Sequence, residues 1–274
     1  DAGIPVHSSV ETAVLCLVAL TEYGITRKRL ITTPPVATIP AAASASAIVA
    51  NAQNEGRRSL LEHEARGLLQ SYSILVTPSV LARTPEELIP AKALFGDCDL
   101  AMKVVSRDIL HKSDAGAVKL NVHGSDEMAK AYAAIIENSK AYNPEADISG
   151  VLVSPMARAG GVEMIIGVTR DPQFGPVMMF GLGGIFVEVL KDVVFRALPV
   201  TTGDAEGMLD EIKAKAILSG VRGAPPVNRQ ALIDLMLKIS QVCLIHPEIR
   251  ELDLNPVLGY DDGYALVDAR MILG

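Results

Sequence analysis

The chain has 274 residues, of which 49% are hydrophobic, and a formal net charge of −7 at pH 7. It is long enough to bury a large core in more than one lobe, and no apolar run approaches the roughly 20 residues that a membrane span needs. The negative charge argues against nucleic acid and anionic membrane surfaces as partners, although local donors can still hold a nucleotide.

Three cysteines, Cys16, Cys98 and Cys243, are scattered along the chain without the spacing of a metal site. An odd, dispersed set is typical of reduced core thiols, so we expect a cytoplasmic protein. The chain opens on Asp1 and lacks a basic start followed by an apolar core. We therefore expect a fragment or a processed piece, with no signal peptide.

The first predicted element is a helix over residues 8–23. Ser8 and Glu11 have capping-box spacing, apolar residues recur on one face, and Gly24 supplies a stop. A stretch rich in proline, alanine and serine follows up to residue 46, which is typical of a connector. This opening segment fits a simple helical arm and the end of a preceding unit about equally well.

Strands and helices then alternate up to about residue 155, which predicts an α/β or α+β lobe. Ser59 and Glu62 have capping-box spacing and mark one helix start, as Thr84 does together with Pro85 for a second helix. The other predicted elements are an interrupted strand over 74–81, strands over 100–105 and 118–123, and a helix over 126–142.

From residue 148 onward the pattern predicts successive strands of an antiparallel sheet, then two helices and a final hairpin. Asn228 is the expected cap of the second helix, and Asp261-Asp262-Gly263 is a strong hairpin turn. The strands are predicted over 151–153, 162–168 and 176–180, and the helices over about 204–218 and 229–244.

A polar turn that includes His111 and Lys112 separates the strands over 100–105 and 118–123. Lys103 leaves the first of these strands on the face opposite Met102. A lysine on a strand beside a donor-rich loop is suited to holding a phosphate chain. On this stretch alone, a solvated lysine and a surface turn is the better interpretation.

A glycine-rich loop follows a predicted strand in Phe180-Gly181-Leu182-Gly183-Gly184-Ile185. Three glycines in four residues allow backbone N–H groups to approach an anion closely. Glycine clusters more often form tight turns, so this motif by itself is a weak signal.

The final hairpin carries the most specific pattern. Asp253 and Asn255 are two residues apart on one strand, and the hairpin pairing brings Asp268 to their face. Two carboxylates and an amide oxygen suit a magnesium ion that keeps its waters and bridges substrate phosphates. A solvent-facing hairpin edge explains the same residues equally well.

A lysine, a glycine loop and an oxygen-only metal triad on two lobes indicate one activity, the binding of a Mg-nucleotide between lobes with phosphoryl transfer. The sequence has no G-x-x-x-x-G-K-[ST] loop, which excludes a P-loop protein. It also lacks the kinase set of His-Arg-Asp and Asp-Phe-Gly.

Residues 103–118, 175–184 and 251–256 closely resemble the ATP-grasp half of NDP-forming acyl-CoA synthetases, the ADP-forming acetyl-CoA synthetase family that is related to succinyl-CoA synthetase. Such enzymes interconvert acyl-CoA, ADP and phosphate with free acid, CoA and ATP through a phosphorylated histidine. The resemblance therefore implies an acid–thiol ligase that uses Mg²⁺ and ATP or ADP.

The resemblance also implies a fold and a division of the chain. It implies an α+β, two-lobe ATP-grasp fold with a nucleotide cleft between the lobes, preceded by a helical arm left from a CoA-ligase segment. The expected parts are a CoA-ligase remnant with its linker over 1–45, an N-terminal lobe over 46–155 and a C-terminal lobe over 156–274.

Carried over residue by residue, the resemblance assigns roles to the motifs. His111 resembles the second relay histidine of the family, and Lys112 is placed to offset the charge that develops during transfer. The alternative for His111, a turn histidine that only bonds backbone, stays open. The resemblance implies that Lys103, Gly183 and Gly184 contact the nucleotide phosphates and that Glu163 contacts the ribose. The implied hinge that faces adenine consists of Val153, Ser154, Pro155 and Met156. The implied magnesium ligands are Asp253, Asn255 and Asp268.

One departure and one absence qualify the resemblance. The family usually has two glycines where this chain has Gly116-Ala117, and the added methyl group either narrows the loop or is harmless. No CoA-binding domain and no primary phosphohistidine segment are recognisable in the sequence. We therefore expect the chain to work with a CoA-ligase half, either a partner subunit or an upstream domain, within a hetero- or homo-oligomer.

A second function from a different class fits the same resemblance. Some protein lysine acetyltransferases resemble this arrangement of two halves, so the chain is alternatively a regulatory nucleotide-binding module with a degenerate synthetase-like region. A degenerate scaffold is the third interpretation, and the joint presence of lysine, glycines and metal ligands argues against it.

Overall fold

The computed structural model describes residues 6–32, 39–109, 111–184, 187, 189–221 and 223–274, with residues 29–32 described by their backbone alone. The chain divides into two compact units, residues 1–38 and 39–274. Within the described residues, no helix has the length and apolar character needed to cross a membrane.

The first unit contains helix α1 (Val10–Thr32), which runs well past the predicted end at Gly24. The predicted stop was wrong because a single glycine inside a helix costs only about 1 kcal/mol relative to alanine. The apolar side chains of α1, among them Val14 and Leu17, are exposed within this unit. Their burial therefore requires contacts that the unit does not supply by itself.

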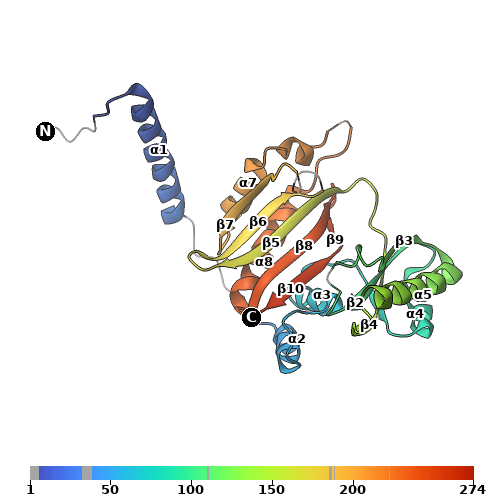
Figure 1. Cartoon of the computed structure of the whole chain (residues 1–274). Helices are drawn as coiled ribbons and strands as arrows, with labels where there is room; N and C mark the ends of the chain where they lie inside the picture. The colour runs from blue at the N-terminus through green and yellow to red at the C-terminus, as the bar shows by residue number, and fades with distance from the viewer. Residues whose placement is uncertain (1–5, 33–38, 110, 185–186, 188, 222) are drawn as a thin grey trace. The chain divides into compact units, whose positions relative to one another are not determined.

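The second unit contains two antiparallel sheets. The smaller sheet has the strand order β1-β4-β2-β3 and carries helices α4 and α5, drawn in green tones in Figure 1. Its elements are β1 (Val80–Ala82), α4 (Leu88–Phe95), β2 (Leu100–Ser106), β3 (Val118–Val122), α5 (Gly124–Tyr142) and β4 (Ile148–Pro155), with a 3-10 turn over Pro85–Glu87.

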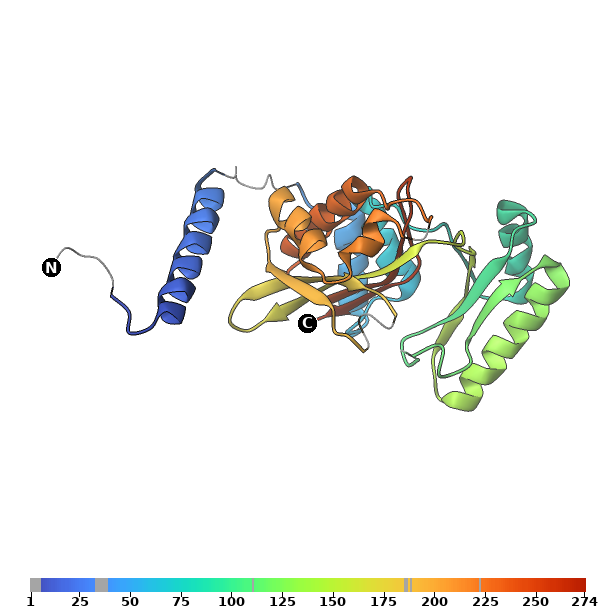
Figure 2. The same cartoon turned by 90° about the horizontal axis from the view of Figure 1, so that it is seen from above.

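The larger sheet has the order β10-β8-β5-β6-β7, with β9 paired to β8, and is seen from above in Figure 2. Its strands are β5 (Val162–Asp171), β6 (Gly175–Leu182), β7 (Val193–Ala197), β8 (Ile249–Gly259), β9 (Tyr264–Leu266) and β10 (Ala269–Leu273). Its helices are α2 (Ala43–Asn54), α3 (Glu62–Ser71), α7 (Thr202–Glu211) and α8 (Arg229–Ile245), with a 3-10 turn over Lys215–Ser219.

The hydrophobic core of the larger sheet includes residues from far apart in the sequence. Leu68 on α3 and Met236 on α8 lie in one buried cluster with Phe180 on β6. Helices α2 and α3 thus share the core of the larger sheet, although α3 and most of α2 fall in the predicted lobe over 46–155 and the first turn of α2 falls in the predicted linker. The sequence division into lobes as a whole stays a prediction.

Several local predictions are confirmed and others are corrected. Asn228 caps α8, since its Oδ1 accepts a hydrogen bond from the Ala231 N–H at 3.0 Å. The final turn is also confirmed, because Tyr260 donates its N–H to the Gly263 carbonyl at 2.8 Å. By contrast, the strand predicted over 151–153 belongs to the smaller sheet, and the helix predicted over 204–218 ends at Glu211.

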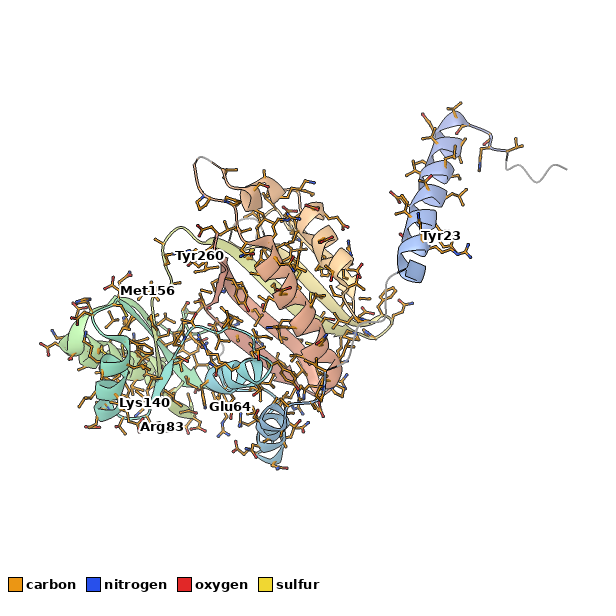
Figure 3. The ribbon with its side chains drawn as sticks, turned by 180° about the vertical axis from the view of Figure 1, so that it is seen from behind. Tyr23, Glu64, Arg83, Lys140, Met156 and Tyr260 are labelled. Atoms are coloured by element: carbon orange, nitrogen blue, oxygen red, sulfur yellow. The ribbon has the colours of Figure 1, made fainter. Side chains whose placement is uncertain are left out.

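The segment that joins β4 to β5 lies against the tip of the final hairpin, as the labelled Met156 and Tyr260 in Figure 3 show. Arg158 stacks over the Tyr260 ring at 4.4 Å from its centroid, and the Tyr260 hydroxyl donates to the Arg158 carbonyl at 2.6 Å. A Cβ at Gly161 would lie 2.8 Å from the same ring. The connection between the two sheets is therefore packed onto the hairpin and needs glycine at that point.

Candidate functional site

A cavity of about 580 Å³ is lined by residues of both sheets. The smaller sheet and the loop after β2 contribute Lys103 and His111 to its wall. The final hairpin contributes Asp253, Asn255 and Asp268. The structure thus brings together, around one concave space, the predicted phosphate-binding lysine, the predicted relay histidine and the predicted metal ligands.

Lys103 reaches the cavity because β2 alternates its faces. Met102 is fully buried in the core of the smaller sheet, whereas Lys103 leaves the opposite face with 8% of its side chain exposed. Its Nζ donates to the Val267 carbonyl at 3.0 Å and lies 3.3 Å from Asp268 Oδ2. The expected approach of this ammonium to the hairpin carboxylate is confirmed.

The hairpin residues converge through strand register. Asp253 pairs with Gly167 of β5, and two residues later Asn255 leaves the same face of β8. Two residue pairs flank Asp268 in this hairpin. Before it, Leu266 of β9 pairs with Val257 of β8, and after it, Ala269 of β10 pairs with Leu254 of β8, so both pairs have the same register. This register sets Asp268 opposite Asn255, as the hairpin prediction required.

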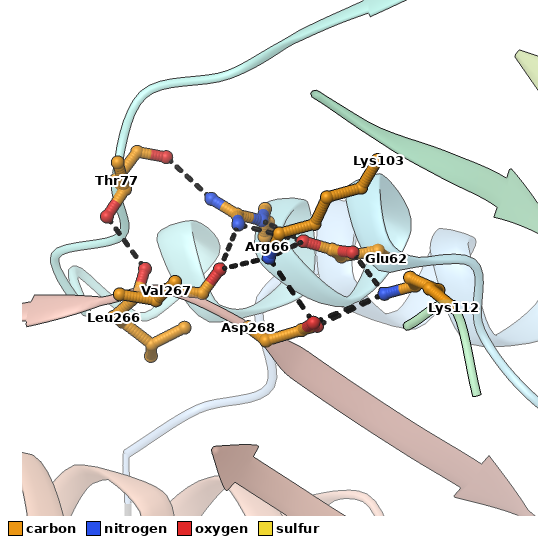
Figure 4. A network of polar contacts seen from close by, with 8 residues as sticks. All are labelled: Glu62, Arg66, Thr77, Lys103, Lys112, Leu266, Val267 and Asp268. Atoms are coloured by element: carbon orange, nitrogen blue, oxygen red, sulfur yellow. Dashed lines mark hydrogen bonds and ion pairs between the residues drawn. The ribbon is translucent and has the colours of Figure 1, made fainter. Parts of the chain in front are cut away.

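A buried ion cluster lies at the edge of the cavity and includes residues that the sequence analysis gave no functional role (Figure 4). Glu62 at the start of α3 pairs with Arg66 one turn later at 2.8 Å, and each side chain is only 3% exposed. Lys112 donates to Glu62 Oε2 and lies 3.2 Å from Asp268 Oδ2. Glu62 and Asp268 together thus hold the ammonium group of Lys112.

Electrostatics keeps this cluster ionised. Burial alone would raise the pKa of Glu62, but Lys112, Lys103 and Arg66 outweigh it and lower that pKa to about 2. Burial would likewise lower the pKa of Lys112, yet Glu62 and Asp268 prevail and raise it. The loop ammonium is consequently charged and fixed at neutral pH, as the binding of an anion requires.

The hairpin oxygens fit a magnesium ion. Burial raises the pKa of Asp253, Arg270 partly opposes the shift, and the nearby Asp268 and Glu251 reinforce it. A carboxylate that is buried among other carboxylates gains from a bound cation. Among the described residues, no group of three His, Cys, Asp or Glu side chains forms a metal site. Two carboxylates and the Asn255 amide instead suit a magnesium that completes its shell with water and phosphate oxygens.

The predicted hinge lies away from this cavity. Val153 is buried inside β4, and Ser154 pairs with Ala101 on β2. The Met156 N–H is already used, because it donates to the Asp99 carbonyl at 2.8 Å. Val153, Ser154, Pro155 and Met156 do not line the cavity, and their contact with adenine stays a prediction.

Glu163 and the glycine loop form a second group. The Gly183 N–H donates to the Glu163 carbonyl at 2.7 Å, and a Cβ at Gly183 would lie 2.9 Å from Glu163 Cβ. Gly183 is therefore required for close packing, and its N–H is not available to an anion. Gly184 is exposed with φ +60°, while Ile185 of the motif lies outside the described residues. Binding of ribose by Glu163 and of phosphate by the glycines stays a prediction.

The loop that follows β2 presents His111 to the cavity with its side chain exposed. The loop is closed by hydrogen bonds from the Ala115 N–H to the His111 carbonyl at 3.3 Å and from the Ala117 N–H to the Lys112 carbonyl at 2.9 Å. Ala117 is fully buried in the core of the smaller sheet. Its methyl group thus packs inward and leaves the cavity wall unchanged.

Sequence reasoning missed Glu62 because its spacing from Ser59 suggested a capping box. In the structure Leu61 is the N-cap, and Glu64 accepts the Leu61 N–H at 2.8 Å. The spacing of Glu62 and Arg66 by four residues on a helix was the available signal, since such residues face the same side.

Comparisons with known proteins identify the family. A family model described as an ATP-grasp domain matches residues 51–273. The β subunit of acetate–CoA ligase [ADP-forming] I from Pyrococcus furiosus is 47% identical over 231 residues, which cover 84% of this chain and 98% of that subunit. The 4-hydroxybutyrate–CoA ligase [ADP-forming] of Nitrosopumilus maritimus is 38% identical over 96% of this chain and 37% of its own length.

Solved structures agree with these matches. A Ca. Korarchaeum cryptofilum acetyl-coenzyme A synthetase in complex with coenzyme A and Ca-AMPCP is 46% identical, with a TM-score of 0.81, over 84% of this chain and 100% of that chain. A second complex of that synthetase contains Mg-AMPPCP and has its phosphohistidine segment pointing towards the nucleotide binding site (43% identity, TM-score 0.73, the same shares of each chain). The chain therefore belongs to the ATP-grasp family and, within it, to the β subunits of the ADP-forming acetyl-CoA synthetases.

Proposed function

We propose that this chain is the nucleotide half of an ADP-forming acyl-CoA synthetase and passes phosphate between a phosphohistidine and ADP or ATP. The complete reaction interconverts acyl-CoA, ADP and phosphate with free acid, CoA and ATP. The observation that carries the proposal is the convergence of Lys103, His111 and Asp268 on one cavity. Side chains that could bind a polyphosphate, ligate its metal and accept a phosphoryl group line the same cavity, which supports phosphoryl transfer.

Each group has a role that follows from its chemistry. Lys103 and Lys112 offer ammonium donors to the phosphate oxygens. Magnesium held by Asp253, Asn255 and Asp268 would neutralise charge on the polyphosphate. A neutral nitrogen of His111 forms a bond to the γ-phosphorus as the bond to the bridging oxygen breaks, and ADP leaves; the reverse step returns the phosphoryl group to ADP.

The metal assignment predicts a loss of nucleotide binding in Asp268→Ala. This variant removes a carboxylate ligand and is expected to weaken Mg-ADP binding by about tenfold or more, measured by titration calorimetry on the chain. Asp261→Ala is the matched control, because Asp261 lies at the exposed tip of the same hairpin and pairs with Arg158. Equal affinity of the two variants would remove Asp268 from the site.

The relay assignment predicts a covalent label on His111. Incubation with radiolabelled ATP and magnesium is expected to label the wild-type chain, alone or with its CoA-ligase half, and to leave His111→Asn unlabelled. His123→Asn is the control and keeps the label, since His123 is exposed and pairs with Asp99 away from the cavity. A wild-type chain that stays unlabelled under both conditions would refute the relay.

The proposal includes a CoA-ligase half as the partner, either as a separate subunit or as part of the same polypeptide. The match to the P. furiosus β subunit covers 84% of this chain and the match to the longer N. maritimus ligase covers 96%. The exposed apolar side chains of α1, which precedes the ATP-grasp region, supply a surface for that half.

We also propose a cytoplasmic location, supported by three cysteines without a disulfide.

A further inference from the structure

We infer that Glu62 is a positioning residue that holds Lys112, and with it the loop that carries His111, at the nucleotide cavity. The inference rests on the proposed function and extends it to a residue outside the predicted site. Glu62 belongs to α3, which packs on the larger sheet, whereas Lys112 follows β2 of the smaller sheet. Their contact therefore joins the two sheets at the cavity wall.

The Glu62 carboxylate is itself held in place. Arg66 donates to Glu62 Oε1 from Nη2 at 2.8 Å and from Nε at 3.2 Å. Arg66 is anchored in turn, because it donates to the Thr77 carbonyl at 2.8 Å and to the Val267 carbonyl at 2.6 Å. Glu62 Oε2 is thus presented to Lys112 from a fixed support.

The two lysines depend on Glu62 to different degrees. Lys103 is held by the Val267 carbonyl at 3.0 Å and by Asp268, and lies 3.7 Å from Glu62. Lys112 has Glu62 and Asp268 as its charged partners among the described residues. A cation on Asp268 would compete with Lys112 for the same carboxylate, whereas Glu62 is not among the predicted metal ligands. Glu62 is therefore the partner that keeps Lys112 in place when the site is loaded.

A neighbouring glutamate separates this role from a general contribution to folding. Glu64 lies on the same turn of α3, accepts two hydrogen bonds from Arg57 at 2.7 and 2.8 Å, and accepts the Leu61 N–H. It supports the start of the helix as Glu62 does, but it is absent from the cavity wall, to which Glu62 contributes. Glu64→Gln is thus a matched control for Glu62→Gln.

Titration of the chain with Mg-ADP tests the inference. Glu62→Gln is expected to bind about tenfold or more weakly than wild type, whereas Glu64→Gln stays within about twofold even where its melting temperature falls. Unchanged or tighter binding by Glu62→Gln would overturn the inference. Failure of the wild-type chain to bind Mg-ADP would instead contradict the proposed function, so the two failures are distinguishable.

A double mutant shows whether Glu62 acts through Lys112 and remains usable if Glu62→Gln alone does not fold. The combination with Lys112→Met removes one charge of each sign from the cluster. The double mutant is expected to bind Mg-ADP within about twofold of Lys112→Met alone, because the partner of Glu62 is already absent. A further tenfold loss in the double mutant would show that Glu62 acts by another route and would overturn the inference.

Discussion

Lys103→Met is expected to lower the affinity for Mg-ADP by a factor of about 30 or more, since removing one partner of a buried charge pair costs about 2 kcal/mol or more. Lys103 presents its ammonium to the cavity from β2 with 8% of its side chain exposed. Methionine keeps much of the apolar stem and removes the charge. The adenine-nucleotide affinity, measured by calorimetry, therefore reports directly on the phosphate contact.

A control on helix α5, which packs on the same sheet, separates this effect from a change in net charge. Lys140, labelled in Figure 3, is exposed at the end of α5 and is absent from the cavity wall. Lys140→Met removes the same charge and is expected to bind Mg-ADP like wild type. If Lys103→Met and Lys140→Met bind equally well, Lys103 does not contact the nucleotide.

Arg66→Met is expected to lower the free energy of unfolding by about 3–5 kcal/mol, the usual cost of breaking a buried ion pair from one side. Removal of the Arg66 guanidinium takes both of its hydrogen bonds from Glu62 Oε1 and takes a donor from the Thr77 and Val267 carbonyls. Urea unfolding measures the difference. Arg229→Met is the control, because its pair with Asp210 is more exposed and worth at most about 1 kcal/mol.

The destabilisation by Arg66→Met is also expected to depend on pH. The folded-state pKa of Glu62 is lowered from 4.5 to about 2, so the stability that its charge contributes is present above pH 4.5 and is lost as the pH falls toward 2. The difference in the free energy of unfolding between wild type and Arg66→Met should therefore become smaller as the pH falls from 4.5 toward 2. A difference that stays constant down to pH 2 would show that packing, rather than the Glu62 charge, causes the loss.

The residue positions that the sequence predicted correctly depend on local geometry. Strand alternation sets Lys103 opposite Met102, and the turn at Asp261-Asp262 fixes the pairing that brings Asp268 to the cavity. Both arguments need only a few neighbouring residues. The resemblance to the synthetase family then supplied the reaction, which no spacing argument contains.

The parts that sequence reasoning missed depend on distant contacts. In the sequence, Glu62 and Arg66 resemble ordinary residues at the start of a helix. Their role depends on distant partners: Lys112 lies 50 residues from Glu62 in the sequence, and Val267 lies 201 residues from Arg66. The packing of α3 on the larger sheet depends in the same way on strands much later in the chain. The four-residue spacing of Glu62 and Arg66 indicates that they pair, but no pattern within a short window places Lys112 or Val267 beside them.

The hairpin formed by β8 and the strands after it restricts changes of length at its tip, although the tip itself tolerates substitutions. Its tip is exposed at Asp261 and Asp262, where many side chains are acceptable. One added residue that shifts the strand pairing would nevertheless move every downstream residue to the other face of the sheet and turn the Asp268 carboxylate away from the cavity. An even change in length would restore the orientation, so parity, more than composition, is the constraint on this stretch.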